Sequence, residues 1–238
     1  PLVASWHTNI HEYAGRRLPR LVPRALRRAA ESVSLRLALR FYQLAGHLLA
    51  PNPELVRLMS EGTGRPCHLM RRGVDCEAFH PGLRQRDDDE LVIGYVGRLS
   101  PEKSVRRLAE LEQYLEASGL RDFRIEIVGH GGERPWLRGN IARLRDHGTL
   151  RGQALARAYA NFDIFAFPSE TDTYGNVVQE AMASGVPCVV MHRGGPASIV
   201  RDACDGLVAE SATDFLDHVL LLAEDGELRA IMGRNARR

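Results

Sequence analysis

The sequence has no run of apolar residues long enough to cross a membrane, which takes about 20 consecutive residues. The residues given show no signal-peptide pattern, internal repeat or low-complexity segment. Its four cysteines, Cys67, Cys76, Cys188 and Cys204, show no paired spacing of the kind that zinc sites use. We therefore expect free thiols, a buried Cys188 and a reducing, cytoplasmic location.

The chain also lacks an initiating methionine, and its first residues already have strand character. We expect the sequence to be a fragment. Its 238 residues suffice for one large or two smaller α/β units, and its 44% hydrophobic and 26% charged content is that of an ordinary globular protein.

A strong excess of one charge is lacking too, since the net charge is +2, but the basic residues are unevenly distributed. They are concentrated in a predicted helical segment near the amino terminus that is rich in arginine and leucine. Such a segment can lie on an anionic membrane; the alternative is that its charged face is simply solvated. We do not expect nucleic acid as a partner, because the sequence shows no nucleic-acid-binding module or aromatic stacking platform. The segment contains Arg16, Arg17, Arg20, Arg24, Arg27, Arg28, Arg36 and Arg40.

The most informative pattern lies between residues 163 and 187. It starts with an apolar run, Asp163–Phe167, which is typical of a buried parallel strand and ends at Pro168. Gly175 then permits a turn with positive φ, and apolar residues recur at helical spacing until Gly185. We expect a helix to begin near Gly175. Its first backbone amides can bind a diphosphate without a metal ion.

Two carboxylates frame the start of this helix. Asp172 lies on the preceding loop, where it can face a sugar. Glu180 lies more than one turn inside the helix, where it can accept hydrogen bonds from a ribose diol without opposing the phosphates. The alternative is an ordinary strand, helix and strand of an α/β sheet, with Glu180 as a solvated helix residue.

A second phosphate-type element lies upstream. An apolar strand over Val92–Val96 is followed by Gly97, Arg98 and Lys103. Ligands of open parallel sheets collect outside the carboxyl ends of the strands, so these two cations and the helix at Gly175 could converge on one pyrophosphate.

The remaining pattern predicts a doubly wound parallel α/β fold, because apolar runs alternate with helical stretches. The expected strands are 92–96, 125–128, 164–167 and 188–191. The amino-terminal part predicts a strand over 1–8 that runs into His7, then helix over 16–45, as one helix or as two broken near Pro23. A strand at 47–50, a helix from Pro53 and a strand at 68–71 follow.

Five motifs make the prediction specific. GYVGRLSPEK, IVGHGGER, FPSETDTYGNVVQEAMASGVP, GGPASIV and DGLV follow one another along the chain. In their order and spacing the chain resembles the retaining glycosyltransferases of group 1, which have the GT-B fold of two Rossmann-like halves. It is most similar to bacterial members that glycosylate lipids or small diols. That family commonly has Glu at both ends of a seven-residue gap, whereas this chain has Asp172 at the first position.

The resemblance implies retaining transfer of a sugar from a UDP- or GDP-sugar to an acceptor hydroxyl, a lipid being one candidate, with peripheral contact at the inner membrane face. It implies no cofactor and no metal. Arg98 and Lys103 would stabilise the departing diphosphate, Asp172 would hold sugar hydroxyls, and His7 would contact the donor sugar or the acceptor. The implied donor-binding residues are Gly97, Gly129, Tyr174, Gly175, Asn176, Val177 and Glu180.

The resemblance also divides the chain into a partial acceptor-side domain (1–80), a linker (81–90) and a nucleotide-sugar-binding domain (91–238). Asp87, Asp88 and Asp89 in the linker suggest the metal-binding acidic motif of the other major glycosyltransferase fold. We reject that interpretation, because linker charge runs are usually solvated and the site needs no cation beyond Arg98 and Lys103. Because part of the acceptor half is expected to be missing, a nucleotide-sugar-binding module without turnover is the alternative function. A phosphorylase or epimerase on the same fold also stays open.

Overall fold

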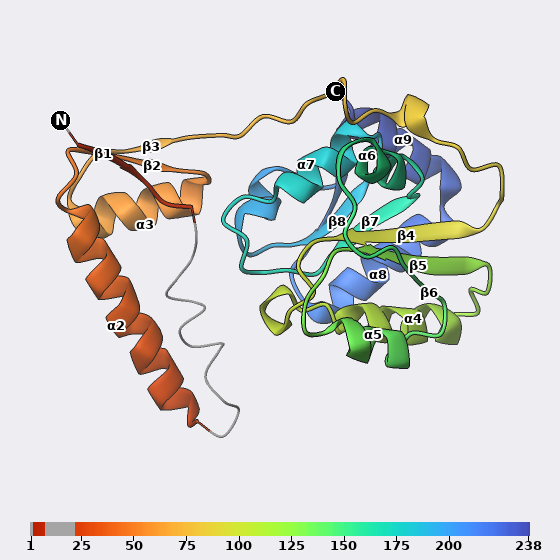
Figure 1. Cartoon of the computed structure of the whole chain (residues 1–238), viewed down its shortest axis with the longest axis horizontal. Coiled ribbons are helices and arrows are strands. Elements are labelled where there is room, and N and C mark those ends of the chain that lie inside the picture. Colours follow the sequence, from red (N-terminus) through yellow and green to blue (C-terminus); the bar gives the residue numbers. More distant parts are fainter. Residues whose placement is uncertain (1, 8–21) are drawn as a thin grey trace. The chain divides into compact units, whose positions relative to one another are not determined.

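The computed structural model describes residues 2–7 and 22–238 (Figure 1). The chain forms two compact units. Unit 1 comprises Pro1–Arg72 together with Thr171–Tyr174, and unit 2 comprises Gly73–Glu170 and Gly175–Arg238. Part of the predicted basic segment, with Arg16, Arg17 and Arg20, lies outside the described residues.

Unit 1 contains a three-stranded parallel sheet in the order β1-β2-β3, with helices α2 and α3 beside it (Figure 1). Its small core includes Trp6, Leu48 and Met59, all buried. Local sequence explains α3: the side chain of Asn52 accepts a hydrogen bond from the amide of Leu55 at 2.8 Å and so caps the first turn. The elements are β1 Val3–Ser5, α2 Arg24–Tyr42, β2 His47–Ala50, α3 Pro53–Thr63 and β3 Cys67–Leu69.

The predicted strand at 47–50 and the helix from Pro53 are confirmed. The strand predicted at 68–71 is shifted to Cys67–Leu69, because its last residue pairs with Ala50, where β2 itself ends. The first strand ends at Ser5, before His7, although the amide of Trp6 still donates to Leu49 O at 2.9 Å. The predicted break near Pro23 coincides with the start of α2.

Unit 2 contains a six-stranded, fully parallel sheet in the order β6-β5-β4-β7-β8-β9. In Figure 1, helices α4, α5 and α8 cover one face and α6, α7 and α9 the other. This doubly wound arrangement was predicted. The strands are β4 Leu91–Val96, β5 Phe123–Val128, β6 Leu144–Asp146, β7 Ile164–Phe167, β8 Cys188–Met191 and β9 Gly206–Ala209. The helices are η1 Pro81–Leu83, η2 Pro101–Lys103, α4 Arg107–Ala117, α5 Arg134–Asn140, α6 Gly152–Ala160, α7 Asn176–Ala183, η3 Gly195–Ser198, α8 Ala212–Glu224 and α9 Gly226–Ala236.

Strands β7 and β8 have the predicted bounds, while β4 and β5 begin one and two residues earlier than predicted. Strands β6 and β9 were not predicted. Both lie at the edges of the sheet, and β6 consists of Leu144, Arg145 and Asp146, two of which are charged. Strand β6 is covered less completely than a central strand, so it does not need the apolar run by which the buried strands were recognised. This reason does not apply to β9, which is apolar and mostly buried.

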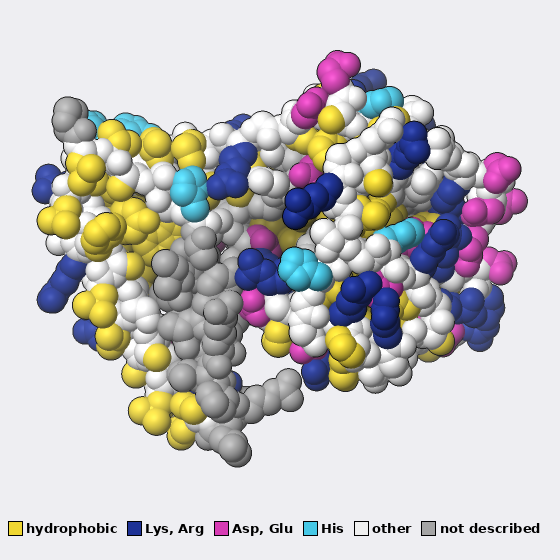
Figure 2. All heavy atoms as spheres, in the orientation of Figure 1, with side chains coloured by type: hydrophobic (Ala, Val, Ile, Leu, Met, Phe, Trp, Pro, Cys, Tyr) yellow, Lys and Arg dark blue, Asp and Glu magenta, His cyan; other side chains and the backbone are white. Residues whose placement is uncertain are grey.

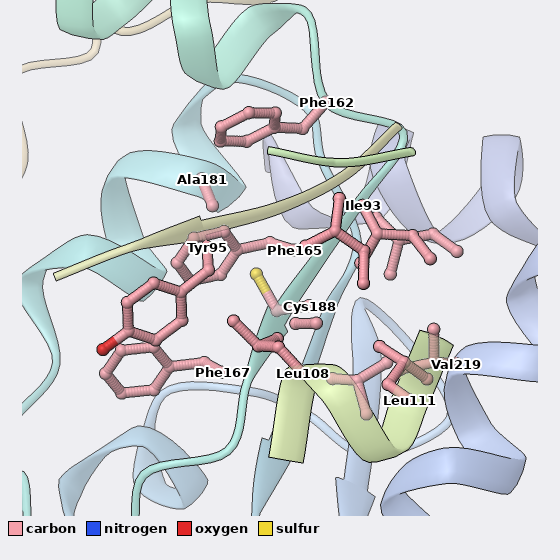
Figure 3. Close-up of a cluster of buried hydrophobic side chains, with 14 of the residues drawn as sticks. Ile93, Tyr95, Leu108, Leu111, Phe162, Phe165, Phe167, Ala181, Cys188 and Val219 are labelled. Atoms are coloured by element: carbon pink, nitrogen blue, oxygen red, sulfur yellow. The ribbon is translucent and has the colours of Figure 1, made fainter. Parts of the chain in front are cut away.

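Aromatic side chains fill the core where β4 meets β7 (Figure 3). Tyr95 of β4 stacks on Phe167 of β7, with the ring centroids 5.8 Å apart and the planes at 15°. Phe167 in turn stacks on Phe165 at 5.8 Å. The stack orients the Tyr95 hydroxyl, which donates to the carbonyl oxygen of Arg98 at 3.0 Å. The core therefore holds the loop that follows β4.

The acidic run before β4 is partly structural. The carboxylate of Asp88 pairs with Arg86, and Arg124 lies 3.9 Å from it. Arg86 also donates to Asp163 at 2.8 Å. Asp88 thus belongs to an ion-pair network, although its side chain stays 48% exposed and remains the solvated linker charge that the sequence predicted. Among the residues that the structure describes, no helix combines the length and apolar character that a membrane span needs.

Candidate functional site

The candidate site lies at the point in the sheet of unit 2 where the order of the strands reverses. Strands β4 and β7 are neighbours, and the chain continues from β4 to β5 on one side and from β7 to β8 on the other. In open α/β sheets, ligands bind in the crevice outside the carboxyl ends of such a strand pair. Gly97–Lys103 follows β4, and the turn at Gly175 follows β7, so both predicted phosphate-binding elements reach this edge.

The two predicted cations differ in exposure. The Arg98 side chain is 58% exposed, and its guanidinium lies 3.9 Å from the Glu102 carboxylate. Lys103, at the end of η2, is only 8% exposed. Arg98 is therefore available to a ligand at the surface, whereas Lys103 adds positive charge from within the turn.

Glycine allows the loops after β4 and β5 to touch backbone to backbone. Gly129 has φ of +145°, and a Cβ there would lie 1.9 Å from Gly97 O. The amide of Leu99 donates to His130 O at 2.9 Å, which joins the same two loops. His130 is exposed on this loop.

Helix α7 begins without a capping side chain, because its N-cap is Gly175, with φ of +110°. The amide of Val178 donates back to Gly175 O at 2.9 Å. The amides of Asn176 and Val177 precede this bond, in the first turn, where helices bind anions. The turn at Gly175 therefore has the open first turn on which the predicted phosphate site depends.

Glu180 lies one turn further along α7 and is half-buried. Burial raises the pKa of its carboxyl, and a hydrogen bond from Tyr159 opposes that rise. The Tyr159 hydroxyl donates to Glu180 Oε2 at 2.8 Å. Burial, and then the charge of Glu180, hold the pKa of Tyr159 well above its usual value, so the phenol keeps its proton. Glu180 is thus held by a hydrogen bond and is not a solvated helix residue.

The other predicted residues belong to unit 1. His7 lies 2.8 Å from the Arg72 guanidinium through Nδ1 and 2.6 Å from Ser5 Oγ through Nε2. Because a guanidinium can only donate, Nδ1 is the acceptor. Tyr174 is buried, and its hydroxyl donates to Arg72 O at 2.8 Å. Asp172 is half-buried on the loop after β7. Arg72 was not predicted as a partner of His7, since a contact across 65 residues leaves no local pattern.

Comparison with known proteins decides the family. The profile described as glycosyl transferases group 1 matches residues 80–238. The chain belongs to this family. A GDP-mannose-dependent alpha-mannosyltransferase of Mycolicibacterium smegmatis is 37% identical over 173 residues, which are 70% of this chain and 44% of that protein. This group 1 chain is also 31% identical, over 258 residues, to a sulfoquinovosyl transferase of Arabidopsis thaliana, of which the match covers 48%.

The structure of sucrose-phosphate synthase from Thermosynechococcus elongatus matches this group 1 chain with a TM-score of 0.80 at 21% identity, over 99% of this chain and 61% of that one. The predicted family and the GT-B fold are therefore confirmed. The chain spans about half the length of the curated relatives it matches.

Proposed function

We propose that this chain transfers a sugar from a nucleotide-sugar donor to an acceptor hydroxyl, with retention of configuration at the anomeric carbon. The observation that carries the proposal is the arrangement at the carboxyl edge of unit 2. The exposed guanidinium of Arg98 and the uncapped start of α7 follow neighbouring parallel strands. Glu180 lies about one turn behind the start of α7, in the same helix.

In the proposed mechanism, the bond between the anomeric carbon and the diphosphate oxygen breaks, and negative charge grows on the leaving nucleoside diphosphate. We propose that Arg98 and the amides of Asn176 and Val177 donate to that charge, and that Lys103, which is buried within the turn, adds to it only through its positive charge. The acceptor oxygen bonds to the anomeric carbon on the same face, and its proton passes to the leaving phosphate oxygen. This step yields retention and reduces the need for a protein base.

Two roles in this proposal rest on the family resemblance. Asp172 holds hydroxyls of the donor sugar, and His7 contacts the donor sugar or the acceptor. Asp172 keeps the charge of the glutamate that is common at this position, but its side chain is one methylene shorter. Unit 2 supplies the contacts to the diphosphate and the ribose.

For the donor we propose GDP-mannose, because relatives at 37% identity are named GDP-mannose-dependent mannosyltransferases. Titration calorimetry with GDP, UDP, ADP and their sugars tests both donor and site. We expect the guanosine series to bind best and Arg98→Ala and Glu180→Ala each to weaken it at least tenfold. Arg121→Ala is the matched control, because Arg121 lies in the loop before β5, at the opposite edge of the sheet. If no nucleotide binds, or if the two site variants bind like the control, the site is wrong.

For the acceptor we propose a lipid, reached by contact of α2 with the cytoplasmic face of an anionic membrane. Leu26, Val33, Leu37 and Phe41 recur at spacings of seven and four residues, so they share one face of α2. All four are exposed, Leu37 to 61% and Phe41 to 66%. Figure 2 shows hydrophobic side chains together with basic ones on the surface over α2. Arg36 and Arg40, also exposed on α2, supply positive charge that would attract anionic lipid headgroups.

Co-sedimentation with vesicles tests the contact. We expect binding to phosphatidylglycerol vesicles and not to phosphatidylcholine vesicles, and loss of binding in the double variant Leu37→Ser and Phe41→Ser. Leu221→Ser, at an exposed leucine of α8, is the control. Equal binding to both vesicles, or by all variants, would show that this face of α2 is a solvated helix face.

Binding without turnover is the second candidate function, because the chain matches about half the length of its relatives. Release of free nucleoside diphosphate from GDP-mannose, measured with an acceptor lipid extract present and absent, separates the two. Transfer predicts product that depends on the acceptor, whereas a binding module predicts none. Turnover that depends on inorganic phosphate would instead indicate a phosphorylase.

A further inference from the structure

Tyr159 has no part in the function proposed so far, yet its hydroxyl is directed at a predicted donor-binding residue. We propose that Tyr159 is a positioning residue that holds the Glu180 carboxylate in the orientation that receives the ribose diol of the donor. The inference rests on the proposed function, since it deepens the role given to Glu180. Tyr159 is fully buried, so it acts through Glu180 and does not touch the nucleotide itself.

The surroundings of Tyr159 give its ring a single orientation. The ring is 5.6 Å from that of Phe79, 5.9 Å from Phe162 and 5.8 Å from Phe165, centroid to centroid. The first two contacts are edge-to-face, a favoured geometry for aromatic pairs, and the third is tilted. Close packing on three sides prevents the phenol from turning away. Its hydroxyl therefore stays on Glu180 Oε2, at 2.8 Å.

A fixed carboxylate matters because of the shape of its ligand. A ribose presents two adjacent hydroxyl donors, and an ionised carboxylate offers two oxygens with about four lone-pair directions. With Tyr159 on Oε2, the Oε1 atom and one direction of Oε2 remain for the two ribose hydroxyls. The terminal torsion of a glutamate is broad, so an unheld carboxylate would have to be ordered by the ligand. The same hydrogen bond favours the ionised, accepting form of Glu180 against its burial.

The hydrogen bond from Tyr159 to Glu180 also joins helices α6 and α7. The two helices are in contact, and Tyr159 is near the end of α6, 21 residues before Glu180 in the sequence. The Tyr159 ring is part of the core between helix and sheet, while its hydroxyl reaches the half-buried carboxylate. The orientation of the carboxylate is thereby tied to the packing of the domain.

Tyr159→Phe tests the inference, because it keeps the ring contacts and removes only the donor. Calorimetry would compare GDP, 2′-deoxy-GDP and 3′-deoxy-GDP, with the uridine series in parallel. In the wild type we expect GDP to bind at least tenfold more tightly than either deoxy analogue. In Tyr159→Phe we expect GDP to bind about tenfold more weakly, equal to about 1.4 kcal/mol, with the analogues changed less than about twofold. The loss would thus be confined to recognition of the ribose diol.

Tyr114→Phe is the matched control, because the Tyr114 hydroxyl also donates to a carboxylate, Asp217, where α4 packs on α8. It should leave all affinities unchanged. Replacing Tyr159 by 4-aminophenylalanine retains both ring and donor and should restore the preference for GDP. This second variant also keeps the test decisive if Tyr159→Phe folds poorly.

The outcomes separate this inference from the function beneath it. Equal weakening of GDP and the deoxy analogues by Tyr159→Phe, or no weakening at all, overturns the positioning role. If Glu180→Gln still abolishes the preference for the ribose diol in that case, the proposed function stands without Tyr159. If the wild type binds no nucleotide, or Glu180→Gln keeps the full preference, the donor site itself is wrong and the inference falls with it.

Discussion

Replacing Gly129 by alanine tests the geometry on which the donor site depends. The new Cβ would lie 1.9 Å from Gly97 O and 3.0 Å from Gly97 C. Both atoms are backbone, so no side chain can rotate out of the way. The loops after β4 and β5 would have to separate, which would move the residue next to Arg98. Gly132→Ala on the same loop is the control, because a Cβ there would meet nothing within 4 Å.

The expected cost has two parts. A non-glycine residue at φ of +145° adds strain of about 1–3 kcal/mol. The overlap with Gly97 resembles overpacking of a core, which costs about 1–3 kcal/mol more. A loss of about 3 kcal/mol lowers the Tm of a domain of 150–250 residues by roughly 6–12 °C. We expect Gly132→Ala to stay within about 0.5 kcal/mol of the wild type, as surface substitutions usually do.

Thermal unfolding followed by circular dichroism measures this difference, and calorimetric binding of GDP measures its effect on the site. Gly129→Ala should melt lower and bind GDP more weakly, whereas Gly132→Ala should do neither. If the two variants melt within 2 °C of each other, the close approach of the two loops is incorrect, and so is the placement of Arg98 that follows from it.

Two further predictions concern burial. The pKa of Glu126 is raised by burial, but hydrogen bonds from His147 and Arg124 outweigh this and lower it overall. A carboxyl whose pKa is lowered by folding stabilises the folded state at pH values above its unfolded pKa of about 4.3. Glu126→Gln should therefore lower the free energy of unfolding in urea by about 1.5–3 kcal/mol at pH 7, and by progressively less as the pH falls below 4. A difference that does not change with pH would contradict this. Cys188 is fully buried, and burial raises the pKa of its thiol well above the usual value. Ellman's reagent should therefore modify the exposed Cys76 in the native protein, but Cys188 only after unfolding. Peptide mass spectrometry would follow both reactions, and similar rates of modification of Cys76 and Cys188 in the native protein would refute the burial of Cys188.

The sequence was most informative where the physical constraint is local. Central parallel strands are buried on both faces and must be continuously apolar, so β7 and β8 were predicted with their observed bounds. A glycine between a strand and a helical pattern predicted the uncapped start of α7 at Gly175. The rule that ligands bind at the carboxyl ends of parallel strands then predicted that Arg98 and Gly175 reach the same edge, as they do.

The tertiary structure decided what depends on distant partners. Lys103 carries the same charge as Arg98 in the same loop, yet packing leaves one side chain buried and the other exposed. The partner of Glu180 is Tyr159, a buried residue that no sequence motif singled out. Sequence by itself determined the central strands and the turn at Gly175, because apolar runs and glycines act on their own neighbourhood, and its motifs indicated the family. The orientation of the carboxylate was decided by α6 packing on α7, because a hydrogen bond is directional and needs its donor within about 3 Å.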